Sequence, residues 1–362
     1  MNHLTRRDFG RLLTVAGTGA FLDLFGSAAA AGNGTRARVV VIGGGFAGAT
    51  CANFLRSYAP QLEVTLVEPK KQYVTCPFSN TVIGGINDMA YITFDYGQLQ
   101  TRRGCKIVQD RVASIDASTR VVRLQGGGTL SYDRLVLAPG IDFLWNKIAG
   151  HSQPASTAIP HAWNAGEQTQ ILVKQLQDMP DGGVVIIAAP LKPFRAPPAI
   201  LERASLIAYY LTASKPKSKV LLLDPNDDEP KLAQFRTAWD ELYPGMIERV
   251  SGPAAEVARL DVAARTLHGT SGAVYKGAVI NLIPPQCAAG IAATADLTDK
   301  SGWCPVNPVS FESTLLKSVH VIGDACAAGE MPKTAFAANV QAKVCAAAII
   351  ASLNGGALLE PT

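Results

Sequence analysis

Short apolar runs recur along the chain, and stretches with helical spacing separate them. Residues 39–42 and 64–67 are such runs, and residues 49–57 between them have the pattern of a helix. Apolar runs of this length without alternation are typical of strands that are buried on both faces of a parallel sheet. The pattern therefore predicts an α/β protein.

A second group of such runs follows in the middle of the chain. Residues 184–189 and 220–224 predict buried strands, and residues 168–177 and 202–213 predict helices beside them, which indicates a second α/β unit. Residues 69–85 show no regular pattern. The other predicted elements are strands at 106–112, 121–124, 132–140, 278–283 and 319–322 and a small-residue helix at 335–351.

A glycine-rich turn follows the first strand. Gly43, Gly45 and Gly48 have the G-x-G-x-x-G spacing, and Glu68 ends the second strand twenty residues later. In a dinucleotide-binding turn the first glycine permits a tight bend, the second lets the backbone approach a pyrophosphate, and the third lets helix and strand pack closely. The free N–H groups of the helix favour the phosphates, and the acid accepts hydrogen bonds from a ribose. The sequence therefore predicts a dinucleotide site here.

The second unit lacks this fingerprint. Residues 190–198 contain no glycine and are rich in proline, so this backbone is too stiff to approach a pyrophosphate. Asp224 ends the next strand at the place of a ribose-binding acid, and without the glycines we interpret it as a structural residue. We expect one bound dinucleotide, and NAD(P)H is not expected as the electron donor.

A second candidate for cofactor binding lies near the end of the chain. Gly323 and Asp324 follow a buried strand and precede the small-residue helix. In flavoproteins such an Asp accepts hydrogen bonds from the ribityl chain, and the helix directs its N-terminus at the pyrimidine end of the flavin. Lys333, just before the helix, is a candidate for stabilising the reduced flavin. Together with the first turn, these residues predict FAD.

Composition limits the other function classes. The net charge is +4, and no cluster of Lys and Arg with interleaved aromatic residues is present, so nucleic acid is not an expected partner. Arg6 and Arg7 precede a short apolar segment and a run of small residues, which predicts a twin-arginine signal peptide at residues 1–31. No later apolar run reaches the length of a membrane span, so none is predicted in the mature protein.

The seven cysteines have no spacing typical of a metal site. Cys51 and Cys345 lie in predicted helices and are interpreted as small buried residues. The sequence assigns no role to Cys105, Cys287, Cys304 and Cys326, and no metal ligands are predicted.

Several motifs together resemble the flavin-binding subunit of flavocytochrome c sulfide dehydrogenase, a relative of sulfide:quinone oxidoreductases and glutathione-reductase-type flavoproteins. They are Y-V-T-C-P-F-S-N, P-H-A-W-N-A-G-E-Q-T, P-F-R-A-P-P, V-I-N-L-I-P-P-Q, G-W-C-P-V and V-I-G-D-A. The resemblance implies two Rossmann-like three-layer domains of the FAD/NAD(P)-linked reductase type. It further implies a periplasmic protein whose FAD is attached through a thioether to Cys76, a small inorganic sulfur substrate and a c-type cytochrome subunit as partner.

The predicted domains are an FAD-binding domain at residues 36–160 and 280–355 and a second Rossmann-like domain without the fingerprint at residues 161–279. The predicted cofactor-binding residues are Gly43, Gly45, Gly48, Glu68, Cys76, Val112, Ala138, Gly140, Gly323, Asp324 and Lys333. Glu202 and Lys333 are the candidates for catalysis, and His161 is interpreted as a residue that orders its loop.

Two departures from the family pattern bear on the substrate. The family places a redox-active cysteine where this chain has Ala196. The resemblance places the partner cysteine in a C-terminal interface segment beyond Thr362, so we expect this chain to lack that domain, either as a shortened relative or as a fragment. Sulfide attack on a disulfide needs a sulfur electrophile, which Ala196 does not supply. The leading hypothesis is a periplasmic FAD oxidoreductase that passes electrons from a reduced sulfur compound to cytochrome c. The alternative is a flavin-carrying electron-transfer or binding protein that has lost sulfide oxidation.

Overall fold

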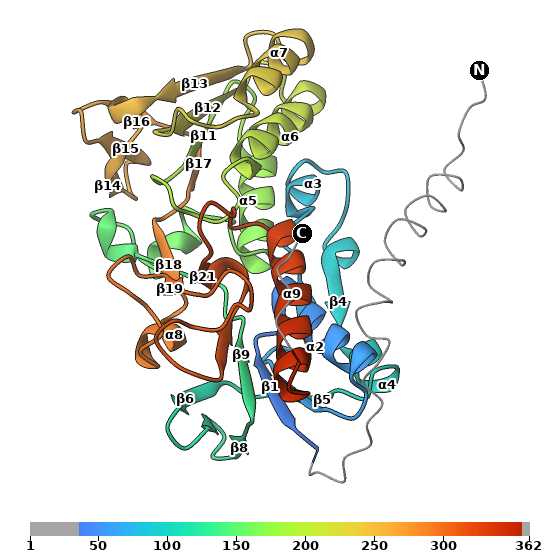
Figure 1. The fold of residues 1–362 in the computed structure, drawn as a ribbon. Coiled ribbons are helices and arrows are strands. Elements are labelled where there is room, and N and C mark those ends of the chain that lie inside the picture. The colour runs from blue at the N-terminus through green and yellow to red at the C-terminus, as the bar shows by residue number, and fades with distance from the viewer. Residues whose placement is uncertain (1–35, 357–362) are drawn as a thin grey trace, which may run out of the picture.

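The computed structural model describes residues 36–356, so the predicted signal peptide lies outside the described residues. Two parallel sheets lie toward opposite ends of the molecule (Figure 1). The first has five strands in the order β20–β9–β1–β2–β5. Its strands are β1 (Arg38–Ile42), β2 (Glu63–Val67), β5 (Lys106–Val108), β9 (Arg134–Leu137) and β20 (Val319–Val321).

The first sheet combines two distant parts of the chain, because β20 pairs with β9 in parallel. Its central strand β1 confirms the predicted buried run, since Val39 and Val41 are fully buried. Two helices, α2 (Phe46–Tyr58) and α9 (Ala335–Leu353), pack side by side over this part of the molecule (Figure 1). Both helices exist as predicted and extend a few residues further.

Helix α9 is composed largely of alanine. Within the part of the chain that the structure describes, it alone has the length and apolar composition that a membrane span needs, and half of that segment is buried. The core helix of a soluble protein meets the same criteria. Among its buried residues, Ala338, Ala342 and Cys345 belong to the same hydrophobic cluster as Cys51 and Leu55 of α2.

The second sheet has four parallel strands in the order β13–β12–β11–β17. They are β11 (Val184–Ala188), β12 (Lys219–Asp224), β13 (Ile247–Ser251) and β17 (Val279–Leu282). Val185 and Ile187 pack with helices α5 (Glu167–Asp178), α6 (Ala199–Ser214) and α7 (Leu232–Leu242), whereas Ile186 and Ala188 pack with the antiparallel strands β14 (Val257–Asp261) and β15 (Thr266–Gly269). The alternating faces of β11 thus separate two cores and produce three layers.

Two regions differ from the sequence prediction. The run at 106–112 is two strands, because Asp110 turns the chain between β5 and β6 (Val112–Asp116); its carboxylate accepts hydrogen bonds from the N–H groups of Arg111 and Gly126. The segment 69–85, predicted to be irregular, contains β3 (Gln72–Val74) and helix α3 (Ser79–Ile83).

The remaining elements are short. The strands are β4 (Thr93–Asp95), β7 (Val121–Leu124), β8 (Thr129–Ser131), β10 (Ile141–Phe143), β16 (Val274–Lys276), β18 (Gln286–Ala288), β19 (Cys304–Pro305) and β21 (Cys326–Ala327), and the α-helices are α4 (Gly97–Thr101) and α8 (Gly290–Thr294). The 3₁₀ turns are η1 (Ala90–Ile92), η2 (Trp145–Lys147), η3 (Pro154–Thr157), η4 (Gly252–Ala254) and η5 (Gly323–Ala325).

The two α/β units meet at a buried guanidinium group. Arg203 of α6 is 2% exposed and donates to Asn80 Oδ1 of α3 at 2.9 Å and to Asn281 Oδ1 of β17 at 2.8 Å. It also donates to the carbonyls of His161 and Ala162. Burial lowers the pKa of Arg203 to about 9, so the group stays charged at neutral pH. Removing one partner of such a buried charge typically costs about 3–5 kcal/mol.

Two buried histidines lie near this junction. His151 and His161 both pack against the ring of Trp145, and neither ring nitrogen of His151 has a hydrogen-bond partner among residues 36–356. Burial lowers the pKa of His151 to about 4, and burial together with nearby positive charge lowers that of His161 to about 3.

These histidines predict an acid-sensitive fold. Their unfolded pKa is near 6.5, so below that pH the unfolded chain binds more protons and stability falls. Each should contribute a loss of about 2 kcal/mol between about pH 6.5 and pH 5. Urea unfolding across this range should show the decrease, and His151→Leu should make it smaller by about 2 kcal/mol. An unchanged pH dependence in that variant would contradict this assignment.

Candidate functional site

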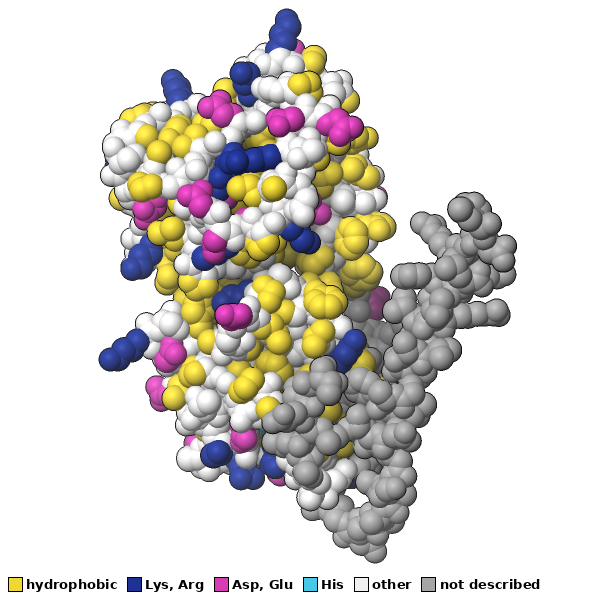
Figure 2. Space-filling view, turned by 45° about the horizontal axis from the view of Figure 1, so that its top comes forward, with side chains coloured by type: hydrophobic (Ala, Val, Ile, Leu, Met, Phe, Trp, Pro, Cys, Tyr) yellow, Lys and Arg dark blue, Asp and Glu magenta, His cyan; other side chains and the backbone are white. Residues whose placement is uncertain are grey.

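A cavity of about 610 Å³ lies between the two α/β units. One wall comes from the loops at the carboxyl ends of β1, β9 and β20, which is where ligands bind in open α/β sheets. The opposite wall comes from the loop at 163–165, from the loop before α6 and from α6 itself. Figure 2 shows hydrophobic side chains gathered across the middle of the visible face, where the upper and lower halves of the molecule meet.

In the glycine turn the backbone passes so close to neighbouring atoms that a side chain would not fit at Gly43 or Gly48. Gly43 has φ +98°, and a Cβ there would lie 2.2 Å from the Ala138 carbonyl oxygen. A Cβ on Gly48 would lie 1.9 Å from the Gly43 carbonyl oxygen, which confirms the packing role predicted for Gly48. Within the part of the chain that the structure describes, Gly45 faces open space apart from Tyr73, and no side chain caps the N-terminus of α2. The start of α2 therefore presents uncapped N–H groups at the cavity.

Glu68 lies at the rim of this turn. Its Oε2 accepts a hydrogen bond from the Gly44 N–H at 2.8 Å and its Oε1 accepts one from the Lys70 N–H at 3.0 Å. These two contacts hold the carboxylate in the cavity wall. Ala138 and Gly140 line the same wall, as predicted for the loop after β9.

The second predicted anchor faces the same cavity. Gly323 has φ +77°, and Asp324 lies among the lining residues with a side chain that is 16% exposed. Burial raises the pKa of Asp324, while Arg195 and Lys333 oppose that shift. The Arg195 guanidinium lies 3.8 Å from the Asp324 carboxylate. Helix α9 begins beside it, capped by Thr334, whose hydroxyl accepts from the Ala337 N–H.

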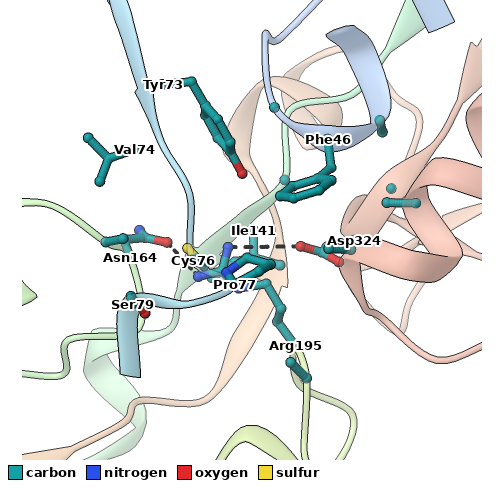
Figure 3. Close-up of a pocket in the computed structure, with 18 of the residues that line it drawn as sticks. Phe46, Tyr73, Val74, Cys76, Pro77, Ser79, Ile141, Asn164, Arg195 and Asp324 are labelled. Atoms are coloured by element: carbon teal, nitrogen blue, oxygen red, sulfur yellow. Dashed lines mark hydrogen bonds and ion pairs between the residues drawn. The ribbon is translucent and has the colours of Figure 1, made fainter. Parts of the chain in front are cut away.

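Cys76 lies in the loop between β3 and α3 and faces the cavity (Figure 3). Its thiol is free and half-buried, and it donates to the Trp163 carbonyl at 3.6 Å. Tyr73 and Phe46 approach the same space, with ring centroids 6.0 Å apart in an edge-on arrangement. The structure thus brings Cys76, the glycine turn and Asp324 together from three distant parts of the chain.

Of the two candidates for catalysis, one lines the cavity and the other does not. Glu202 lines the cavity, and its Oε2 accepts from Asn80 Nδ2 at 2.7 Å. Lys333 does not line it: its ammonium donates to the carbonyls of Asp324 and Cys326 and lies 3.6 Å from the centre of the Trp303 ring. Backbone carbonyls thus hold the charge of Lys333 behind Asp324, and its contact with the cofactor stays a prediction.

Val112 also lies outside the cavity lining, at the start of β6, where its side chain is buried in the first core. Conversely, sequence reasoning gave no role to Arg195, Asn80 or Trp163, which all line the cavity. The motif P-F-R-A-P-P contained Arg195, but nothing in its spacing indicated that its side chain reaches across to Asp324. Ala196 beside it lines the cavity with φ +51°.

Comparisons with known proteins agree on one group of flavoproteins. The family model described as "Sulfide dehydrogenase [flavocytochrome c] flavoprotein chain, central" matches residues 169–284, and "Pyridine nucleotide-disulphide oxidoreductase" matches residues 37–175. The flavoprotein chain of flavocytochrome c sulfide dehydrogenase from Chlorobaculum thiosulfatiphilum is 64% identical over 45 residues, which are 12% of this chain and 94% of that sequence.

Longer matches concern sulfide:quinone oxidoreductases. The mitochondrial enzyme of Mus musculus is 23% identical over 331 residues, which are 84% of this chain and 69% of that sequence. The solved structure of the enzyme from Aquifex aeolicus has a TM-score of 0.72 at 20% identity and covers 88% of this chain and 77% of that chain. This likeness confirms the predicted α/β fold with Rossmann-like domains.

The close packing at Gly48 gives a test of the turn. Gly48→Ala places a methyl group against the Gly43 carbonyl, so the turn has to open, and the free energy of unfolding should fall by about 3 kcal/mol. Gly128→Ala is the control, because its nearest neighbour would be a Leu124 methyl at 3.4 Å. Urea unfolding should show a change of no more than about 0.5 kcal/mol for the control. Equal effects of the two substitutions would contradict the tight packing.

Proposed function

Because the chain belongs to the family of the flavoprotein chain of flavocytochrome c sulfide dehydrogenase and is thus an FAD-dependent oxidoreductase, we propose that it transfers electrons from a reduced sulfur compound to a c-type cytochrome. We further propose that its FAD is attached covalently to Cys76. The observation that carries this proposal is the convergence of Cys76, the glycine turn and Asp324 on one cavity.

The residues of the cavity fit FAD. The uncapped start of α2 and the bare backbone at Gly45 suit a pyrophosphate, and Glu68 would accept from the adenosine ribose. Asp324 would accept from ribityl hydroxyls, and the N-terminus of α9 would face the pyrimidine end. Bound FAD supplies two-electron oxidation of a substrate and one-electron delivery to an acceptor.

The cavity wall opposite the glycine turn, formed by the loop before α6 and by α6 itself, supports a reaction that differs from disulfide-mediated oxidation. Ala196 occupies the place that the family resemblance assigns to a redox cysteine, and a methyl side chain cannot form a persulfide or accept electrons. Arg195 supplies a positive charge on this wall, and Glu202 supplies an acid held by Asn80. Arg195 is suited to bind an anion, and Glu202 to hold or release a proton there.

Ala196 also favours a second candidate function. In this alternative the chain is a flavin-carrying electron-transfer or binding protein that no longer oxidises sulfide. Both functions retain FAD at the same cavity, and they differ in whether a sulfur compound reduces it.

The location is part of the proposal. The twin arginine pair at the start of the chain supports export to the periplasm, where a covalent bond would prevent loss of the cofactor. The twin-arginine route transports folded proteins, which suits a protein that takes up FAD before export.

The attachment site is tested by denaturation. The native protein should retain its flavin in acid or urea, and its mass should exceed that of the chain by one FAD less two hydrogens if the flavin is oxidised. Cys76→Ala should release all flavin on denaturation, because no sulfur then faces the cavity from this loop. Cys287→Ala, which changes a half-buried thiol outside the cavity lining, is the control and should retain the flavin. A colourless precipitate and an unmodified mass for the native protein would refute the Cys76 link.

Sulfide reactivity separates the two functions. Without a disulfide at Ala196, anaerobic sulfide should bleach the visible flavin absorbance slowly under the leading function and not at all under the alternative. Dithionite is the positive control and should bleach it at once. Rapid bleaching at micromolar sulfide would show that the reading of Ala196 is wrong and would exclude the alternative function.

A further inference from the structure

We propose that Arg195 and Trp163 form a bracket that positions the Cys76 sulfur for its bond to the flavin. The inference rests on the covalent attachment proposed above. It assigns a positioning role to two residues that the quoted motifs contain but to which the sequence analysis gave no role.

The bracket consists of reciprocal hydrogen bonds. Trp163 Nε1 donates to the Arg195 carbonyl at 2.9 Å, and Arg195 Nη2 donates to the Trp163 carbonyl. The same Trp163 carbonyl accepts from the Cys76 thiol at 3.6 Å. One oxygen atom therefore fixes both the guanidinium and the sulfur, and Figure 3 shows Arg195 beside Cys76.

Further contacts support the bracket, so the Trp163 carbonyl has little freedom to move. Arg203 donates to the neighbouring Ala162 carbonyl at 2.7 Å and lies 4.8 Å from the centre of the Trp163 ring. The Arg195 N–H donates to Gln286 Oε1 at 2.9 Å, and Arg195 Nη2 also donates to Asn164 Oδ1 at 2.7 Å. Such supporting contacts are what hold a reacting group within a fraction of an ångström.

Arg195 also connects the two predicted flavin anchors. Its Nη2 reaches the carbonyl that orients Cys76, and its Nη1 lies 3.8 Å from the Asp324 carboxylate. Cys76 comes from the loop after β3 and Asp324 from the turn after β20, so Arg195 sets the spacing between groups that have no direct link in the chain.

Attachment joins the Cys76 sulfur to the flavin through one thioether bond. The S–H bond of Cys76 and one C–H bond of the flavin 8α methyl group break, and a C–S bond forms. Two electrons and two protons pass to the flavin ring, which is left reduced. Dioxygen is the two-electron acceptor that then reoxidises it. In this step the Trp163 carbonyl directs the S–H group, and the Arg195 guanidinium offsets negative charge on sulfur as the proton leaves.

The test separates attachment from binding. Arg195→Met, Arg195→Lys and Trp163→Phe are produced as full-length apoproteins and mixed with FAD in air. Total flavin per chain is measured on the folded protein, and the covalent fraction is measured over time from the intact mass after denaturation. Arg265→Met is the matched control, because Arg265 also donates to a backbone carbonyl, that of Ala278 at 2.7 Å, and does not line the cavity.

Arg195→Met and Trp163→Phe should form the covalent bond about tenfold more slowly at the same total flavin, and Arg195→Lys should recover part of the rate. Arg265→Met should match the native chain. A native rate in Arg195→Met and Trp163→Phe, or a covalent fraction that falls only in proportion to bound flavin, would overturn the bracket and leave the Cys76 link intact. Release of all flavin from the native chain would instead refute the link itself, and the bracket with it.

Discussion

The second wall of the cavity depends on one buried charge. The Arg203 guanidinium has lost nearly all contact with water, so its side chain has to find acceptors within the protein. It takes them from α3, from β17 and from the backbone at His161 and Ala162. The loop that follows, with the Trp163 carbonyl and Asn164, is thereby placed against Cys76. Arg203 does this from α6, on the helix-covered face of the second sheet, without itself being a candidate for chemistry.

The second sheet has the strand order of a nucleotide-binding domain. The acid at the end of β12, where such a domain binds a ribose, has a structural role here. Asp224 is 1% exposed, and its carboxylate accepts from Arg249 at 3.0 Å and from Asn226 at 2.9 Å. This acid is fully engaged within the protein, which supports its interpretation as a structural residue. The second α/β unit lacks the glycines that a nucleotide site needs, and the family resemblance assigns it no nucleotide. We therefore conclude that the second unit supplies one wall of the cavity whose other wall is the glycine turn of the first unit.

The sequence allowed prediction of features that depend on neighbours along the chain. The buried strands, helices α2, α5, α6 and α9, and the two glycine turns follow from local pattern and turn geometry. Helix α7 and the strands β13 to β16 were missed, since many of their positions are only partly buried and their apolar pattern is weak. The positions of the Arg195 and Lys333 side chains could not be predicted from the sequence. Both side chains are long, and the backbone carbonyls that hold each of them come from parts of the chain that only folding brings close.

The pairing of β20 with β9 has a consequence for how the protein is made. Asp324 emerges from the ribosome about 280 residues after the first strand, which at about 5–20 residues per second is a delay of about 15–55 seconds. Before the end of that interval the second α/β unit, which is continuous in the chain, is complete and able to form its own cores. The glycine turn is synthesised early, but its cavity is complete only after β20 has joined the first sheet. Capture of the cofactor is therefore one of the final events in the synthesis of this chain.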